Sequence, residues 1–287
     1  MGRVFSFPGL LVAALVGAVA WPGLHARAQS SAPVSPNPQS KPEMTESCPG
    51  LVAFGPPAPI AAAFRRAALD ADQVRITYVG HSTFLIESPK LVRIATDYND
   101  WVRPPLVPDI VTMNHAHSTH YTDRPAAGVR FVLRGWRDDG APANHDVSFQ
   151  DVRVRNVPTN IRNWNGGTER HGNSIFIFEI ANLCIAHLGH LHHTLTQQQL
   201  DDIGRVDVVM APVDGNMTLD LDGMVEVLQA MKAQMVIPMH SFSAYTLDRF
   251  LARMRQDYRV DMNETPSLVV SKTKLPAAPT VVVLPGR

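Results

Sequence analysis

Short apolar runs rich in β-branched residues recur along the chain and predict strands. Most of these runs have four to six residues and are bounded by Gly, Pro, Asn or Asp, which is the sequence pattern of strands. The predicted strands are Val74–Val79, Thr83–Glu87, Leu91–Thr96, Asp109–Met113, Val129–Leu133, Val152–Val157, Ser174–Glu179, Leu183–Leu188, Val206–Ala211 and Met235–Pro238.

Apolar residues at helical spacing predict two helices late in the chain. The two stripes are Leu221, Met224, Val225, Leu228 and Met231, and Leu247, Phe250, Leu251 and Met254. Weaker helix candidates are Ala58–Asp70 and Thr196–Ile203, the second with Thr194 or Thr196 as its N-cap. Strand pairs come first, and strands alternate with helices from about Leu183, so we expect one layered α/β domain rather than a sandwich of sheets alone or a helical bundle.

The first 28 residues have the pattern of a secretory signal peptide. The apolar stretch Leu10–Trp21 has 12 residues, fewer than the ~20 that a membrane span needs. A Pro-Gly pair follows it, and an Ala-Arg-Ala triplet ending at Ala28 supplies a cleavage pattern. We therefore expect cleavage after Ala28, a secreted or periplasmic protein, and no stable membrane span after cleavage. The alternative is an uncleaved anchor, because residues 4–24 carry no charge.

The rest of the chain reads as a leader followed by one folded domain. Residues 29–50 are rich in Ser and Pro and predict a flexible leader, which leaves 51–287 as the domain. Hydrophobic residues make up 45% of the chain and charged residues 18%, which excludes disordered and fibrous classes. Lys and Arg number 26, as do Asp and Glu, and loss of the signal leaves a net charge of −2. This balance argues against nucleic acid as a partner and favours a small molecule.

Two cysteines are too few for a disulfide scaffold or a thiolate metal cluster. Cys184 lies within an apolar strand pattern, where we expect a buried thiol. Export would also permit a disulfide with Cys48, and the sequence leaves that pairing open.

The twelve histidines are unevenly placed along the chain, and their positions are the strongest indication of function in the sequence. His115, His117 and His120 fall within six residues, four more fall within 187–193, and His240 ends the run VIPMH. Each window follows the end of a predicted strand, and loops that follow neighbouring strands open on the same edge of a sheet. Neutral imidazole ligands favour zinc and its transition-metal neighbours, so the pattern predicts a metal site. The isolated histidines are expected to be ordinary surface or core groups: His25, His145, His171 and His187.

Several segments, in their order and spacing, resemble the metallo-β-lactamase fold superfamily. They are ITYVGHSTFLIES, IATD, PDIVTMNHAHSTHYTD, NSIFIFE, LCIAHLGHLHHTLT, VDVVMAPVDGNMTLD and MVIPMH. Within the superfamily, the chain is most similar to the branch of ascorbate-phosphate lactonase-like hydrolases and phospholipase D-like hydrolases that release N-acylethanolamines. The resemblance implies a four-layer αβ/βα sandwich with a metal site at one edge, and hydrolysis by metal-activated water.

The resemblance also implies ligand positions, some of which are altered. Four histidines match the superfamily's ligand positions: His115, His117, His120 and His240. Thr119 stands where the pattern His-x-His-x-Asp-His has its aspartate, and the expected third histidine would fall near residues 159–160, which hold none. His190 stands where the superfamily has an aspartate that bridges two metals.

These changes favour one metal ion per chain. A carboxylate can bridge two cations, whereas a neutral imidazole offers a single lone pair. We expect zinc, with other transition metals possible, bound by His115, His117 and His190. His120 or His240 completes the site or acts on the bound water, which makes His120 a catalytic candidate. An all-histidine site leaves the ion its full charge, which would suit an anionic substrate group.

Carboxylates near these windows are candidates for a supporting role. Asp123 lies three residues after His120 and is our second catalytic candidate, as the group that holds an imidazole N–H. Asp97 and Asp214 are further acidic candidates. The alternative for each of the three aspartates is a turn or cap role, and the sequence PVDG favours it strongly for Asp214. His81, in the turn GHST, either borders the site or is only a turn residue.

Two functions follow. The first is an exported metal-dependent hydrolase, in which metal-bound hydroxide attacks a small ester, lactone or phosphodiester. The alternative is a member of the same fold that binds metal and is catalytically silent, because two expected carboxylates and one expected histidine are missing.

Overall fold

The computed structural model describes residues 68–163 and 165–286, all within one compact unit, Lys41–Arg287. The predicted signal peptide, the leader, Cys48 and most of the predicted helix Ala58–Asp70 lie outside the described residues. Within the described part of the chain, no helix combines the length and apolar character that a membrane crossing needs.

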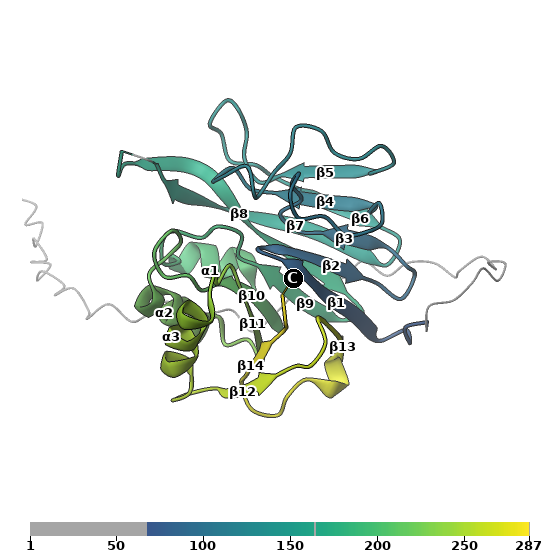
Figure 1. Cartoon of the computed structure of the whole chain (residues 1–287). Coiled ribbons are helices and arrows are strands. Elements are labelled where there is room, and N and C mark those ends of the chain that lie inside the picture. Colours follow the sequence, from purple (N-terminus) through teal and green to yellow (C-terminus); the bar gives the residue numbers. More distant parts are fainter. Residues whose placement is uncertain (1–67, 164, 287) are drawn as a thin grey trace, which may run out of the picture. The chain divides into compact units, whose positions relative to one another are not determined.

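Two mixed β-sheets form the frame of the domain (Figure 1). The strands of the first sheet, in spatial order, are β13 (Ser267–Ser271), β1 (Gln73–Gly80), β2 (Thr83–Glu87), β3 (Arg93–Ala95), β4 (Ile110–Met113) and β5 (Phe131–Arg134). Those of the second are β12 (Arg259–Met262), β14 (Thr280–Val283), β11 (Met235–Met239), β10 (Val208–Pro212), β9 (Leu183–His187), β8 (Thr168–Ile180), β7 (Val152–Arg162) and β6 (Asp146–Phe149).

In the described part of the chain, three α-helices lie on one side of the second sheet (Figure 1). They are α1 (Gln197–Ile203), α2 (Leu221–Met231) and α3 (Ala244–Met254). Thr196 caps α1 in a capping box with Gln199, so one of the two predicted N-caps is confirmed. A 3-10 turn, Lys272–Lys274, precedes β14.

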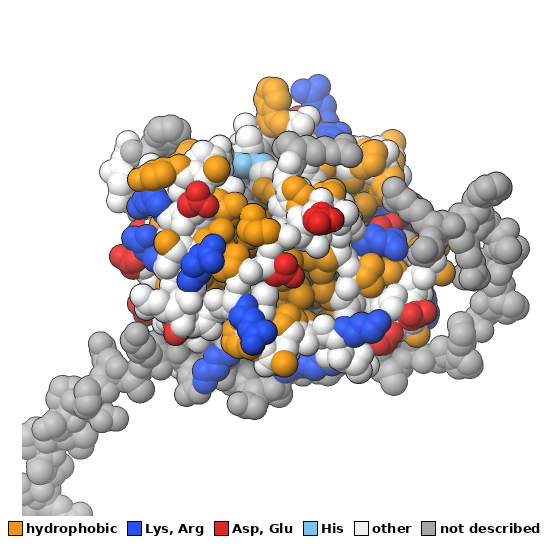
Figure 2. Space-filling model, turned by 60° about the horizontal axis from the view of Figure 1, so that its bottom comes forward, with side chains coloured by type: hydrophobic (Ala, Val, Ile, Leu, Met, Phe, Trp, Pro, Cys, Tyr) orange, Lys and Arg blue, Asp and Glu red, His pale blue; other side chains and the backbone are white. Residues whose placement is uncertain are grey.

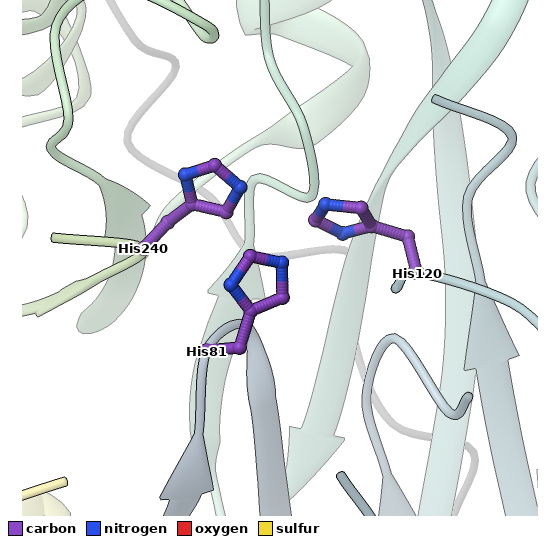
Figure 3. A group of neighbouring side chains, drawn as sticks. All are labelled: His81, His120 and His240. Atoms are coloured by element: carbon purple, nitrogen blue, oxygen red, sulfur yellow. The ribbon is translucent and has the colours of Figure 1, made fainter. Parts of the chain in front are cut away.

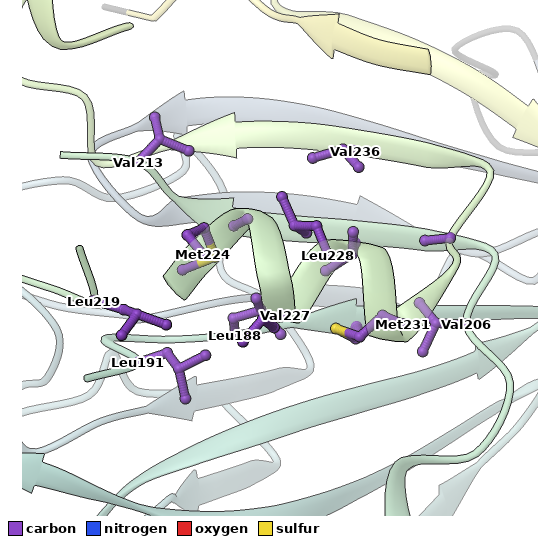
Figure 4. Packing of buried hydrophobic residues seen from close by; sticks show 14 of the residues in the cluster. Leu188, Leu191, Val206, Val213, Leu219, Met224, Val227, Leu228, Met231 and Val236 are labelled. Atoms are coloured by element: carbon purple, nitrogen blue, oxygen red, sulfur yellow. The ribbon is translucent and has the colours of Figure 1, made fainter. Parts of the chain in front are cut away.

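Alternation of side chains along the strands builds two large cores. In β8, Phe176 and Phe178 face the first sheet, while Ile175 and Ile177 face the helices. Figure 4 shows how the buried face of α2 packs on the second sheet and its loops. The α2 residues in this contact are Met224, Val227, Leu228 and Met231.

The outer face of the first sheet is covered by loops. Val111 and Met113 of β4 pack there with Trp136, and the loop residues Tyr121 and Val129 lie against them. The described helices therefore lie on one side of the sandwich only, and the described residues that cover the outside of the first sheet belong to loops. The predicted α/β fold class is confirmed with this difference in its outermost layer.

Pattern alone missed four strands. β6 and β12 are largely exposed and lack the apolar alternation that identified the others. β13 and β14 are short, and they pair with β1 and β11, which lie far away along the chain. Cys184 in β9 is buried and disulfide-bonded, so the expectation of a buried thiol is wrong.

Parallel strands determine where the loops gather. β3, β4 and β5 run parallel in the first sheet, as do β9, β10 and β11 in the second. Their carboxyl ends carry every histidine window noted above, so loops from both sheets can meet at one edge.

Candidate metal centre

Imidazoles from separate loops converge at this edge (Figure 3). His81 comes from the β1–β2 turn, His120 from the loop after β4, and His240 directly follows β11. The His81 ring centroid lies 4.3 Å from that of His240 and 4.9 Å from that of His120. One possible ligand atom of each residue lies within 4.8 Å of the other two. This spacing can hold one ion.

Two buried carboxylates orient two of these rings. His120 Nδ1 lies 2.6 Å from Asp97 Oδ2, and both side chains are fully buried. His240 Nδ1 lies 3.0 Å from Asp214 Oδ1. An ionised carboxylate only accepts hydrogen bonds, so it holds the proton of each neutral imidazole on Nδ1 and leaves the lone pair on Nε2. The lone pairs of both rings are therefore available to a cation.

Five buried ring nitrogens lack a hydrogen-bond partner among the described residues, and three of them belong to this group: Nε2 of His120, His190 and His240. The other two are Nδ1 of His171 and Nε2 of His193. A buried polar atom without a partner costs free energy, and such atoms are rare in folded proteins. The rings are also close neighbours, since the centroid of His190 lies 4.7 Å from His120 and 5.0 Å from His240. An ion bound by Nε2 of His120 and His240 would satisfy two of these atoms, so the residues present fit a metal.

His81 completes the group from a strained turn. Its backbone φ is 52°, in the left-handed region, as are those of Asp97 (41°) and His240 (57°). The His81 carbonyl accepts from the Tyr78 hydroxyl at 2.8 Å and from the His240 amide at 2.9 Å, which fixes the turn against β11. Its Nε2 lies 3.1 Å from the Thr119 hydroxyl. Both sequence-based alternatives for His81 hold, because it is a turn residue and it borders the site.

The other predicted site residues lie in different surroundings. The ring of His115 stacks on Trp136 at 5.0 Å, and its Nδ1 lies 2.8 Å from Glu169 Oε1, so its described contacts lie outside the buried group. His117 is half-buried, with its ring 4.8 Å from that of His190. Asp123 is 78% exposed and pairs with Arg134. The role expected of Asp123 was to hold an imidazole N–H, and at His120 this role is filled by Asp97.

Sequence reasoning could not pair the carboxylates with their histidines. Asp97 follows β3 and is 23 positions from His120, while Asp214 follows β10 and is 26 positions from His240. Asp214 also accepts hydrogen bonds from the backbone amides of 216–218, so its expected turn role is confirmed alongside the contact with His240. The available signal was that Asp97 stands directly after a predicted strand and Asp214 stands three residues after one.

Of the four isolated histidines, His187 and His145 have the hydrogen-bond partners expected of ordinary groups. His25 lies outside the described residues, and Nδ1 of His171 is buried without a partner among them. His187 is buried, with Nε2 2.9 Å from the Ser82 carbonyl and Nδ1 accepting from the Gly189 amide. The Nε2 of His145 lies 2.7 Å from the Arg134 carbonyl.

Burial keeps the imidazoles neutral. It lowers the pKa of His81 and of His192 to about 4 and holds the pKa of His120 well below its usual value, with neighbouring histidines acting in the same direction. Burial also raises the pKa of Asp97 to about 6. At Asp214 burial acts upward, but hydrogen bonds from His240 and Thr218 outweigh it and hold the pKa well below its usual range. Neutral imidazole is the form that binds metal.

A cavity of about 530 Å³ opens beside His81 and His240. Its other walls are mainly apolar and include Phe242, Leu247 and Met262, and none of the described residues that line it is a Lys, Arg, Asp or Glu. Apolar side chains also gather on the face in Figure 2, between scattered charged groups. A substrate bound at the ion could place an apolar portion in this cavity.

Buried histidines, oriented by carboxylates at the edge of an α/β sandwich, place the protein in the class of metal-dependent α/β-sandwich proteins. The chain belongs to the β-lactamase superfamily, because the superfamily's domain profile matches residues 75–240. The expected superfamily is thereby confirmed.

Relatives carry names in keeping with a metal-dependent enzyme. The UPF0173 metal-dependent hydrolases of Thermoplasma acidophilum and Thermoplasma volcanium are 24% and 25% identical to the chain. These alignments cover 59% and 58% of this chain and 84% and 83% of the relatives. The predicted enzyme class, a metal-dependent hydrolase, agrees with these names.

Solved structures share the fold. A proposed Zn-dependent hydrolase of the metallo-β-lactamase superfamily from Thermotoga maritima is 26% identical, with a TM-score of 0.55, over 75% of this chain and all of that one. A structure from Parabacteroides distasonis is 13% identical, with a TM-score of 0.51, over 63% of this chain and 88% of that one, and shows the fold alone.

Proposed function

We propose that the protein is an exported, single-metal hydrolase of small esters, lactones or phosphodiesters. The observation that carries this proposal is the pair of buried Nε2 atoms of His120 and His240, which Asp97 and Asp214 orient toward one point. His81 is the third proposed ligand, because a ligand atom of its ring lies within 4.8 Å of the other two. Three histidine nitrogens and one open position match the coordination of catalytic zinc, so zinc is the proposed ion.

Different residues of the chain orient the metal ligands, surround the substrate and transfer protons. Asp97 and Asp214 keep the ligand rings in the metal-binding tautomer, and the apolar cavity beside His81 and His240 excludes water from part of the substrate. His117, half-buried at the rim of the group, can carry a proton between the site and solvent. A bound ion supplies the Lewis acid that activates water and polarises the scissile oxygen.

A single ion is proposed because the second position lacks anionic ligands. Thr119 offers only a hydroxyl, which lies against His81, and His190 offers an imidazole where a bridging carboxylate would stand. Missing carboxylates disfavour a second divalent cation more than a first, because repulsion between the two cations is not screened. The resemblance to the lactonase-like and N-acylethanolamine-releasing branch supports an ester-like or phosphodiester substrate with an apolar part.

Export completes the proposal. The apolar stretch of the first 28 residues and the small-residue pattern ending at Ala28 support cleavage there and a periplasmic or secreted location. The test is the N-terminal sequence of the protein recovered from its own cell. Mature protein that begins at Gln29 is expected, and a retained apolar segment would contradict export by cleavage.

The proposed activity is tested on purified protein with two measurements, metal content and turnover. Elemental analysis should find one transition-metal ion per chain, and a panel of p-nitrophenyl esters, lactones and bis-p-nitrophenyl phosphate should show metal-dependent turnover. His120→Gln and His240→Gln should each abolish both. The matched control is His145→Gln, because His145 is hydrogen-bonded outside the buried group and should leave both unchanged.

The outcomes separate the two functions. Turnover that survives complete removal of the metal would refute the proposed mechanism, and two ions per chain would refute the single-site argument. One bound ion without turnover on any class of the panel would favour the catalytically silent alternative.

A further inference from the structure

We propose that His190 points an N–H group into the site as a hydrogen-bond donor and does not bind the metal. This inference rests on the proposed metal site formed by His81, His120 and His240, and it assigns the fourth buried imidazole a different task. It also replaces the ligand role that the sequence suggested for His190.

A backbone amide determines which ring nitrogen of His192 carries the proton. Arg162, the last residue of β7, directs its N–H to Nδ1 of His192 across 2.5 Å. A backbone amide can only donate, so Nδ1 of His192 must be the acceptor and carries no proton. The carbonyl of Met217 also lies beside this imidazole, but a proton on Nδ1 would be forced against the Arg162 N–H. The single ring proton of His192 is therefore on Nε2.

The position of Arg162 is itself fixed. Its guanidinium donates to the carbonyl of Asn216 at 3.0 Å and to that of Thr218 at 2.7 Å, which ties the end of β7 to the loop after β10. The amide that sets the His192 tautomer therefore belongs to a well-anchored segment.

A hydrogen bond between His192 and His190 then determines which nitrogen of His190 carries the proton. Nε2 of His192 lies 2.8 Å from Nδ1 of His190, so Nε2–H of His192 donates and Nδ1 of His190 accepts. A neutral imidazole carries one proton, which in His190 must then be on Nε2. This nitrogen is buried and has no hydrogen-bond partner in the described part of the chain. The His190 ring cannot turn freely, because its amide donates to Asn173 Oδ1 at 2.8 Å and the ring is fully buried.

The unpartnered Nε2 atoms of His120 and His240 thus differ from that of His190 in whether they carry a proton. Carboxylates hold the protons of His120 and His240 on Nδ1 and leave lone pairs facing the site, whereas the Arg162–His192 pair leaves an N–H facing it from His190. A lone pair binds a cation, and an N–H binds an oxygen that carries or gains negative charge. For His190 to ligate a metal, both ring protons of this pair would have to move and the Arg162 amide would lose its acceptor.

A donor at this place has a defined use. It lies beside the rings of His120 and His240, at centroid distances of 4.7 and 5.0 Å, so an oxygen held at the ion comes within reach of its N–H. The task of His190 is to stabilise the scissile oxygen as it gains charge, which makes it a catalytic residue that contacts the substrate.

The first experiment reads the ring protons directly in metal-free protein. Long-range ¹H–¹⁵N correlation spectra at neutral pH should show His190 and His192 protonated on Nε2, and His120 and His240 protonated on Nδ1. Signals are assigned by their loss in single His→Gln variants. A proton on Nδ1 of either His190 or His192 would overturn the proposal.

The second experiment compares zinc affinity and turnover in three variants. His190→Gln keeps an N–H donor and should bind zinc within about threefold of the native protein, whereas His240→Gln should lose at least about 100-fold in affinity. His190→Leu should keep zinc affinity but lose about 100-fold or more in kcat. Equal losses of zinc affinity in His190→Gln and His240→Gln would identify His190 as a ligand and overturn the proposal.

The two proposals can fail separately. If no substrate is turned over, while the Nε2 protons and the unchanged zinc affinity of His190→Gln are observed, the donor role stands and the hydrolase proposal fails. If turnover is metal-dependent but His190 carries its proton on Nδ1, the reverse holds.

Discussion

Replacing Asp97 with asparagine is expected to weaken metal binding by about 10- to 100-fold with little change in the fold. The two side chains have nearly the same size, and asparagine is among the residues that best tolerate the left-handed φ of 41° at this position. The new amide therefore fits the buried site that the carboxylate occupies between His120 and Asn114.

The hydrogen bonds around residue 97 determine which way the new amide points. The Ser174 amide donates to Asn114 Oδ1 at 2.8 Å, so Asn114 presents its Nδ2 donor to residue 97 at 3.0 Å. In Asp97→Asn the amide oxygen must accept from Asn114, and the amide nitrogen then faces Nδ1 of His120 across 2.6 Å. The favoured response is that His120 moves its proton to Nε2, which removes a lone pair from the metal site.

The magnitude follows from this conflict. To bind metal, the variant must bring two N–H groups together in a fully buried place, and an unsatisfied buried donor costs about 1–3 kcal/mol. That range corresponds to about 5- to 150-fold in affinity. Without metal, the free energy of unfolding should change by no more than about 1 kcal/mol, because the variant also removes a carboxylate that burial destabilises.

Competition with a zinc-binding chromophore at pH 7.5 measures the affinity, and circular dichroism with a thermal melt checks the fold. Asp123→Asn is the matched control, since Asp123 is exposed and pairs with Arg134, and it should leave the affinity unchanged. A folded Asp97→Asn protein with native zinc affinity would refute the proposed role of Asp97 in orienting His120.

Three further predictions concern stability. Gly189 has φ 60°, and a Cβ there would overlap side-chain atoms of two buried asparagines, so Gly189→Ala should lower the free energy of unfolding in urea by about 3 kcal/mol or more. The control Gly140→Ala has φ 73° and open space around it, so it measures the cost of the backbone conformation alone, about 1 kcal/mol. Equal losses in the two variants would contradict the crowding argument. Acidification from pH 6.5 to 4 should destabilise the metal-free protein, because His81 and His192, with pKa values lowered to about 4, stay neutral while the same histidines of the unfolded chain bind protons. Asp97, with its pKa raised to about 6, opposes this over part of the range, but it is one group against two. Urea midpoints that do not fall on acidification would contradict the assignment. Removal of the metal should lower Tm, since an ion at 1,000 times its Kd adds about 4 kcal/mol to the free energy of unfolding, and a melt indifferent to chelator would argue against a built site.

The sequence predicted the frame of this domain better than the details of its site. Strand ends could be found because buried strands such as β4 and β9 are continuous apolar runs with histidines just beyond them. The exposed strands β6 and β12 have no such run, since pairing partners rather than side-chain burial place them in the sheet.

At the site, the limits of sequence reasoning were conformational. His115 and His120 lie in one short motif, yet the loop turns His115 onto Trp136 and His120 onto Asp97, and the spacing of residues does not encode which way a loop curls. Which ring nitrogen of His190 carries the proton depends, through His192, on the backbone amide of Arg162, 28 positions away along the chain. Only the folded structure creates this contact.

The left-handed backbone conformations of His81, Asp97 and His240 lower the free energy of unfolding of the protein. At each of these positions glycine would relieve local strain, so selection for a more heat-resistant protein alone would favour losing the very residues that form the site. A laboratory evolution experiment that rewards only folding should therefore erode these three positions early. Their persistence under selection for activity would be a record of what the organism uses the protein for.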